Sequence, residues 1–290
     1  MKTIRNFTFI SLLIAISLSI LSCSNNKESV ETSNSKEILL KENKNPTKEE
    51  QNIEHKDINR FEGLTLTNND IGIPVLYYHS IEPSEANELI LAPKRLREQL
   101  QYIKDAGYTT LTMREVYDHL VNNAPIPEKS ILLTFDDGYM DNYTYAFPLL
   151  KEFNMKATIF LMTVGVDEGF YISSEQMKEM SDYGIDIECH TINHVHLSKL
   201  SYEEQLKEIT ESRDFIKKVT GKDVISISYP YGDYNEDTLR AVKNAGYSIA
   251  FGINRGKANR SDNIFTLDRI YVNSLETMDQ FINNLEQAKL

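Results

Sequence analysis

Short apolar runs alternate with amphipathic segments along residues 61–290, and this alternation predicts strands separated by helices. The runs are rich in β-branched and aromatic residues, and the segments between them repeat apolar residues at helical spacing. The clearest helix begins at Ser201, where Glu204 completes a capping box, and it ends near Gly221. Strands are predicted at residues 74–79, 109–111, 130–135, 157–161, 185–189, 225–229, 248–251 and 269–272.

A regular series of about seven or eight strand–helix units favours a distorted (β/α) barrel over an open doubly wound sheet. In such a barrel the C-terminal ends of the strands converge on one face, and the loops there build the active site. Polar residues follow several of the predicted strands. The sequence therefore predicts one rim that collects His79, Asp136, Asp137, His190 and the segment 229–232.

The first sixty residues differ in composition from this domain. Two basic residues precede a nearly uncharged apolar stretch, residues 7–21, which is followed by Ser22 and Cys23. A spanning helix needs about 20 apolar residues, so the stretch has the form of a secretion signal. The next residues are mostly polar and cannot form a core, which predicts a flexible tether. The predicted organisation is a signal peptide at 1–22, a tether at 23–60 and one domain at 61–290.

Composition narrows the classes of function. The net charge is −12 and the acidic residues are scattered, so nucleic acid is not expected as a partner. The chain has no tryptophan but 16 tyrosines, so a sugar-stacking surface would be built from tyrosine. Cys189 directly precedes His190 in a predicted strand, so its side chain should point away from that histidine and pack as a small apolar group.

Two motifs carry the candidate chemistry. Residues 134–139 read TFDDGY and residues 190–194 read HTINH. One carboxylate and two imidazoles form a ligand set for a catalytic divalent metal that leaves a coordination position open for water. Asp136, as the second carboxylate, is then a candidate proton acceptor. The alternative is that the histidines are a loop residue and a helix cap that merely lie near each other.

These motifs resemble those of the NodB-type polysaccharide deacetylases, carbohydrate esterase family 4. Residues 134–138 match the first motif of that family and residues 190–194 match the second. Residues 229–232, which read YPYG, match the end of the third. The resemblance extends from about Ile73 to the C-terminus and implies the barrel fold of that family.

The resemblance also implies roles for individual residues. Asp137, His190 and His194 would bind the metal, usually zinc in this family, and the mixed donors leave cobalt and nickel open as well. Asp136 would be the general base, and the backbone N–H of Tyr231 would stabilise the oxyanion. Two tyrosines of the matched segments are candidate substrate-binding residues, Tyr139 and Tyr229.

The chain departs from the usual family pattern in two ways. It has no histidine after His196, so the general acid would come from upstream, with His79 as the candidate and His196 as its competitor. This arrangement resembles the circularly permuted branch that includes poly-β-1,6-N-acetylglucosamine deacetylases. Ser228 stands where relatives carry an arginine that pairs with the base, and Arg269, oriented by Asp268, is the predicted replacement. An ordinary surface pair is the alternative for these two residues.

The ending of the signal region resembles a bacterial lipobox, which implies cleavage before Cys23 and lipidation of its sulfur. A plain signal peptide is the alternative. The sequence thus predicts a monomeric, extracytoplasmic lipoprotein, anchored to the cell membrane, that removes acetyl groups from an N-acetylglucosamine polysaccharide. The alternatives are an O-acetyl esterase or other amide hydrolase on the same fold, and a non-catalytic carbohydrate-binding lipoprotein.

Overall fold

A computed structural model describes residues 60–84 and 86–288 of the chain. The predicted signal peptide, Cys23 and all but the last residue of the predicted tether lie outside these residues. Among the described residues, no helix has the length and apolar character that crossing a membrane requires. The proposed boundary between tether and domain at residue 60 stays a prediction.

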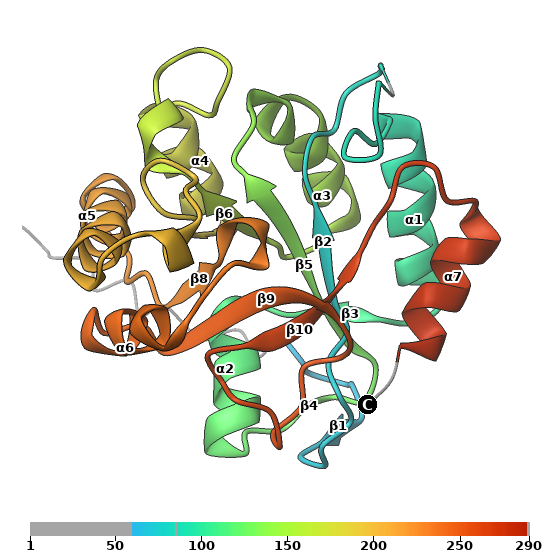
Figure 1. The fold of residues 1–290 in the computed structure, drawn as a ribbon. Coiled ribbons are helices and arrows are strands. Elements are labelled where there is room, and N and C mark those ends of the chain that lie inside the picture. Colours follow the sequence, from blue (N-terminus) through green and yellow to red (C-terminus); the bar gives the residue numbers. More distant parts are fainter. Residues whose placement is uncertain (1–59, 85, 289–290) are drawn as a thin grey trace, which may run out of the picture. The chain divides into compact units, whose positions relative to one another are not determined.

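Seven parallel strands of the described chain close into a barrel (Figure 1). The ring closes because β2 pairs with β10 on one side and with β5 on the other. The closed ring confirms the predicted (β/α) barrel. In order around the ring, the strands are β2 (Val75–Tyr78), β5 (Ser130–Asp137), β6 (Thr158–Leu161), β7 (Asp186–Cys189), β8 (Ser226–Ser228), β9 (Ile249–Arg255) and β10 (Leu267–Tyr271).

Three short strands lie outside this ring. The predicted run 109–111 forms β3 (Thr109–Thr110), which pairs in parallel with the start of β5 and does not join the barrel. An antiparallel pair, β1 (Leu66–Thr67) and β4 (Ile126–Pro127), was not predicted, since two residues are too few to show a period.

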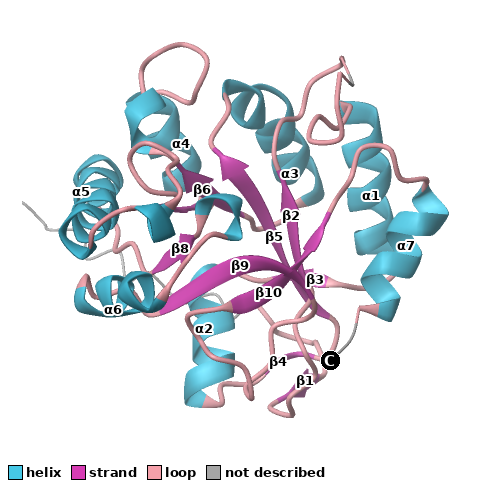
Figure 2. Cartoon of the chain, in the orientation of Figure 1, coloured by secondary structure: helices cyan, strands magenta, loops and turns pink. Residues whose placement is uncertain are grey.

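Helices surround the strands, as Figure 2 shows in cyan around magenta. The helix predicted from Ser201 is α5, and both hydrogen bonds of its capping box are present. It ends at Gly221, whose φ of 73° is left-handed. The helices are α1 (Pro93–Asp105), α2 (Met113–Asn122), α3 (Phe147–Phe153), α4 (Ser174–Tyr183), α5 (Tyr202–Thr220), α6 (Glu236–Asn244) and α7 (Met278–Gln287).

Side chains alternate along each strand between two separate cores. Outward residues such as Leu133 and Phe135 of β5 pack with the surrounding helices, whereas the inward residue Leu132 belongs to a second cluster inside the barrel. Helix α2 contributes Met113 and Val116 to that inner cluster, so it closes the N-terminal end of the barrel. The other end stays open, and the polar ends of the strands meet there.

Candidate active site

A pocket of about 530 Å³ opens at the C-terminal end of the barrel strands. Every barrel strand except β6 supplies a lining residue, either from the strand itself or from the loop that follows it. The pocket therefore contains the rim residues that the sequence predicted to meet. Its lining is Tyr77, His79, Glu88, Leu89, Asp136, Asp137, Tyr139, His190, His194, Tyr229, Tyr231, Ile253 and Tyr271.

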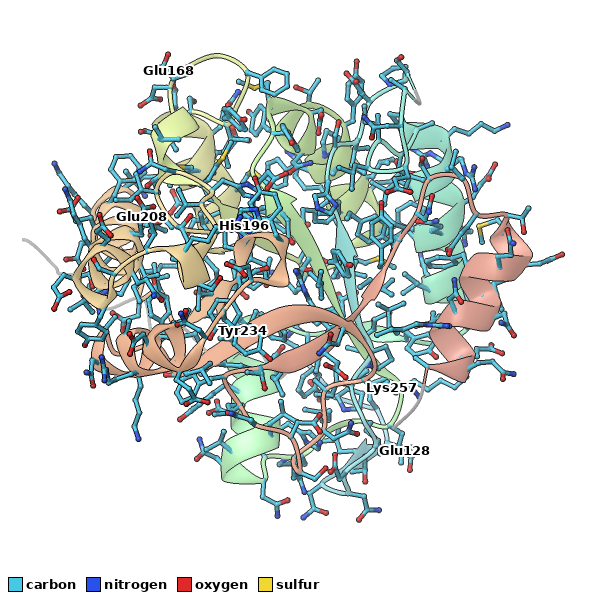
Figure 3. All side chains as sticks on the ribbon, viewed as in Figure 1. Glu128, Glu168, His196, Glu208, Tyr234 and Lys257 are labelled. Atoms are coloured by element: carbon cyan, nitrogen blue, oxygen red, sulfur yellow. The ribbon has the colours of Figure 1, made fainter. Side chains whose placement is uncertain are left out.

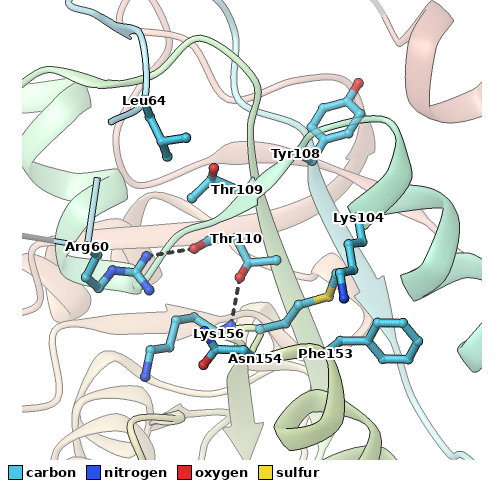
Figure 4. A pocket seen from close by; sticks show the side chains of 10 residues that line it. Arg60, Leu64, Lys104, Tyr108, Thr109, Thr110, Phe153, Asn154 and Lys156 are labelled. Carbon is cyan, nitrogen blue, oxygen red and sulfur yellow. Dashed lines mark hydrogen bonds between the residues drawn. The ribbon is translucent and has the colours of Figure 1, made fainter. Parts of the chain in front are cut away.

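A second pocket, of about 620 Å³, lies at the N-terminal end of the strands, beside β3 (Figure 4). Its basic side chains are Arg60, Lys104 and Lys156. Arg60 is already paired with Glu115 at 2.8 Å and also donates to a backbone oxygen. The His and Asp cluster that could hold a metal lies in the first pocket, so we place the chemistry there.

Asp137, His190 and His194 converge in the first pocket, with ligand atoms that all lie within 4.8 Å of one another. Asp137 Oδ1 lies 3.4 Å from His190 Nε2 and 3.2 Å from His194 Nε2. This oxygen is buried and has no hydrogen-bond partner among the described residues, as expected of an atom that would face a cation. The donor set therefore fits a divalent metal with nitrogen and oxygen ligands.

Hydrogen bonding fixes which atoms of this cluster face inward. His190 Nδ1 lies 2.7 Å from the backbone oxygen of Ser228, so it donates there and leaves Nε2 as a free ligand atom. Burial by itself would raise the pKa of Asp137, but the two imidazoles beside it hold that pKa well below its ordinary value. Asp137 is consequently an anion at neutral pH, as metal binding requires.

The loop that carries both histidines is tightly wound. Thr191 and His194 have left-handed φ values of 68° and 52°, and Thr191 Oγ1 accepts the backbone N–H of His194. Glu208 of α5 accepts the backbone N–H groups of Ile192 and Asn193 at 3.1 and 3.0 Å. Figure 3 labels this glutamate on the helix beside the loop. Sequence reasoning missed Glu208 because nothing in helical spacing shows that a residue clamps a distant loop.

Asp136 forms a fully buried ion pair with Arg269. The guanidinium donates to both carboxylate oxygens at 2.9 and 2.8 Å, and Arg269 has no exposed surface. Ser228 accepts a further hydrogen bond from Arg269 at 2.8 Å. The positive charge thus reaches Asp136 from β10, while a serine hydroxyl occupies the position of the missing arginine.

The predicted orienting role of Asp268 is wrong. Neighbouring residues on a strand point to opposite faces, so Asp268 lies outside the barrel, against Gly256. Arg269 is held instead by Gly252 and Thr134, whose oxygens accept from it at 2.9 and 3.2 Å.

The ion pair determines the charge of Asp136. Burial would raise the pKa of this carboxyl, but the charge and hydrogen bonds of Arg269, together with the charges of His190 and His79, lower it. A carboxylate has about four lone-pair sites, so an ionised Asp136 still has room to accept a proton from the pocket.

His79 lies in the pocket at the end of β2, with its backbone oxygen held by the side-chain amide of Asn142 at 2.8 Å. Its Nδ1 is buried without a hydrogen-bond partner among the described residues. Burial lowers the pKa of His79, although Asp136 and Asp137 oppose the shift. The competitor, His196, is not part of the pocket lining and stacks on the Tyr231 ring at 4.1 Å.

Three tyrosines were predicted in this region, and they differ in position. Tyr231 lines the pocket with a left-handed φ of 59°, and the residue is 54% exposed. Tyr139 also lines the pocket, and its ring stacks on Tyr171. Tyr229 is also among the lining residues, but its side chain is buried in the outer core and its hydroxyl donates to the backbone oxygen of Phe265, so its predicted substrate contact stays a prediction.

Comparison with known proteins places the chain in a family. The family model described as polysaccharide deacetylase matches residues 123–250. The chain is 36% identical over 231 residues to "Putative polysaccharide deacetylase YxkH" of Bacillus subtilis (strain 168), an alignment that covers 80% of this chain and 82% of that protein. The chain belongs to the polysaccharide deacetylase family. Two further similarities are to proteins whose names state an activity.

The first is to the poly-beta-1,6-N-acetyl-D-glucosamine N-deacetylase of Staphylococcus aureus (strain MSSA476), with 27% identity over 211 residues. That alignment covers 68% of this chain and 72% of the relative. The second is to the structure of Streptococcus pyogenes deacetylase PplD in complex with acetate, with 34% identity and a TM-score of 0.71. It covers 75% of this chain and 99% of that one.

Replacing Arg269 by methionine leaves Asp136 buried without its counter-charge. We expect this variant to lose about 3–5 kcal/mol of free energy of unfolding. Burial is then opposed only by the nearby His190 and His79, so the pKa of Asp136 rises and the acidic limb of the activity profile moves to higher pH. Denaturant unfolding and a pH–rate profile measure the two effects.

Arg255→Met is the matched control, because Arg255 is exposed on the neighbouring strand and contacts Asn284. Adding Asp136→Asn to the Arg269→Met variant should recover part of the lost stability, since no buried charge remains unpaired. An acidic limb that does not move in Arg269→Met would contradict the assigned role.

Proposed function

We propose that this chain is a lipid-anchored, metal-dependent N-deacetylase of a cell-surface N-acetylglucosamine polysaccharide. The observation that carries the proposal is the convergence of Asp137, His190 and His194 beside the ionised carboxylate of Asp136. Poly-β-1,6-N-acetylglucosamine is the preferred substrate, and the named activity of the Staphylococcus aureus relative supports this choice. Peptidoglycan is the second candidate.

In the proposed reaction, some residues of the pocket bind the metal and another acts as the general base. Asp137, His190 and His194 would hold a divalent cation, with zinc preferred and cobalt or nickel also compatible with the donors. When bound, it would supply Lewis-acid polarisation of the acetamide carbonyl and a lowered pKa of water. Asp136, kept ionised by Arg269, takes the proton of the attacking water.

The remaining residues serve the oxyanion and the leaving amine. The backbone N–H of Tyr231 donates to the developing oxyanion, and the left-handed backbone at this residue fixes the direction of the donor. His79 protonates the leaving nitrogen. It is favoured over His196 because it lies in the pocket, whereas His196 is not among the lining residues and stacks on the Tyr231 ring.

The proposal is tested with purified protein and defined β-1,6 and β-1,4 N-acetylglucosamine oligomers. We expect equal amounts of acetate and free amine, loss of turnover on chelation, and recovery on addition of zinc, cobalt or nickel. Asp137→Ala should lose metal-dependent turnover because a ligand is missing. Asp268→Asn is the matched control, since Asp268 lies outside the barrel.

The outcomes separate the alternatives. Acetate released from O-acetylated sugars without any free amine would indicate an esterase instead. Oligomer binding without turnover under every added metal would indicate a non-catalytic binding protein.

His79→Gln tests the general acid. We expect kcat to fall about a hundredfold or more. Activity requires the protonated form of His79, and its pKa is lowered, so it deprotonates as the pH rises through that value and produces the basic limb of the profile. The variant should lose this limb in a pH–rate measurement. His196→Gln, as the control, should keep it, and the opposite pattern would assign the acid to His196.

Membrane anchoring is tested at Cys23. The full-length chain should fractionate with membranes, and Cys23→Ser should release it, because the proposed diacylglyceryl group supplies two buried acyl chains. Immunoblotting of membrane and soluble fractions measures the change. Cys189→Ala is the matched control, since Cys189 is buried against α5. A Cys23→Ser chain that stays in the membrane fraction would refute the lipid anchor.

A further inference from the structure

An exposed aromatic ring stands beside the catalytic rim. Phe170 is 66% exposed and lies in the loop between Thr163–Gly165, a short 3-10 helix, and α4. Figure 3 labels Glu168 in the same loop, which projects beyond the barrel at the top of the view. A large apolar side chain in water at the edge of a pocket is typical of an interaction site.

The ring is braced by two tyrosines. Tyr139 and Tyr171 stack with centroids 5.5 Å apart and an interplanar angle of 19°. Phe170 stands nearly perpendicular to both rings, at 5.5 Å from Tyr139 and 5.1 Å from Tyr171. These edge-to-face contacts are favourable and fix the orientation of the exposed ring. Since Tyr139 lines the catalytic pocket, the aromatic cluster extends from that pocket to the outer surface.

The backbone ties this loop to the loop that carries Asp137. Met140 donates its N–H to the Phe170 oxygen at 2.9 Å, and Ile172 donates to the Gly138 oxygen at 3.0 Å. Asp167 caps the following helix by accepting from both the N–H and the hydroxyl of Ser174 at 2.8 Å. The exposed ring is therefore preorganised, and a ligand that binds it loses little free energy in ordering the loop.

We propose that Phe170, backed by Tyr139 and Tyr171, forms an accessory subsite that stacks on a sugar ring next to the residue being deacetylated. A β-linked pyranose presents axial C–H groups on its faces, and these groups complement the negative face of an aromatic ring. Tyr139 contacts the Phe170 ring and lines the same pocket as Asp137, so this subsite lies beside the proposed metal ligands. The inference rests on the proposed polysaccharide substrate. It adds that Phe170 makes the protein prefer longer oligomers over the monomer.

The test compares N-acetylglucosamine monomer and pentamer as substrates. Phe170→Ala should lower the ratio of kcat/KM for pentamer over monomer about tenfold, mainly through KM, because the buried ring area is lost. Phe170→Tyr should restore most of the ratio, since it keeps the ring. Val121→Ala, at an exposed position on α2 at the other end of the barrel, is the control and should keep the wild-type ratio.

Calorimetric titration of the pentamer tests the subsite independently of turnover. If the wild-type protein releases no acetate, the proposed function fails, but about tenfold weaker pentamer binding by Phe170→Ala would still support the subsite. Equal pentamer affinity in the two proteins overturns it. An equal loss of kcat on monomer and pentamer also overturns it, because this pattern indicates a structural role of the loop. Loss of phospholipid-vesicle binding with unchanged pentamer affinity would assign the ring to a lipid surface and reject the sugar subsite.

Discussion

The buried ion pair between Arg269 and Asp136 is the constraint on which the rest of the site depends. Neither charge could be buried alone, because the loss of hydration would cost several kcal/mol. Five hydrogen bonds from the guanidinium go to Asp136, Ser228, Thr134 and the Gly252 oxygen. Since these partners come from β5, β8 and β9, the arginine of β10 also sets how the strands meet beneath the pocket.

Much of the fold could be predicted from the sequence because barrel strands and helices have different apolar periods. The capping box at Ser201 predicted where α5 begins, and Gly221 predicted where it ends. The place of β3 outside the ring could not be predicted, since pairing is a long-range property. The strands β1 and β4 could not be predicted, because two residues are too few to show an alternation of apolar and polar side chains.

The candidate site was predictable where chemistry restricts the residue type. Asp137, His190 and His194 stood out because few other residues bind metals at that spacing. Arg269 was predicted because the usual arginine is missing at Ser228. The residues that hold its guanidinium, Gly252 and Thr134, could not be predicted, since their positions depend on the registers of the strands. The error at Asp268 has the same origin, because adjacency in sequence means opposite faces on a strand. A motif also does not show which side of the barrel a ring occupies, so the packing of the Tyr229 side chain in the outer core could not be predicted.

Helix α2 fills the N-terminal mouth of the barrel with apolar side chains, so the catalytic pocket is a blind recess. A glycan cannot thread through such a recess, so each reacting acetyl group must enter it from a polysaccharide chain that lies across the opening. Acetate has to leave by the route through which the group entered. An enzyme built this way has no need of a free chain end and is suited to modifying interior positions along a long polymer.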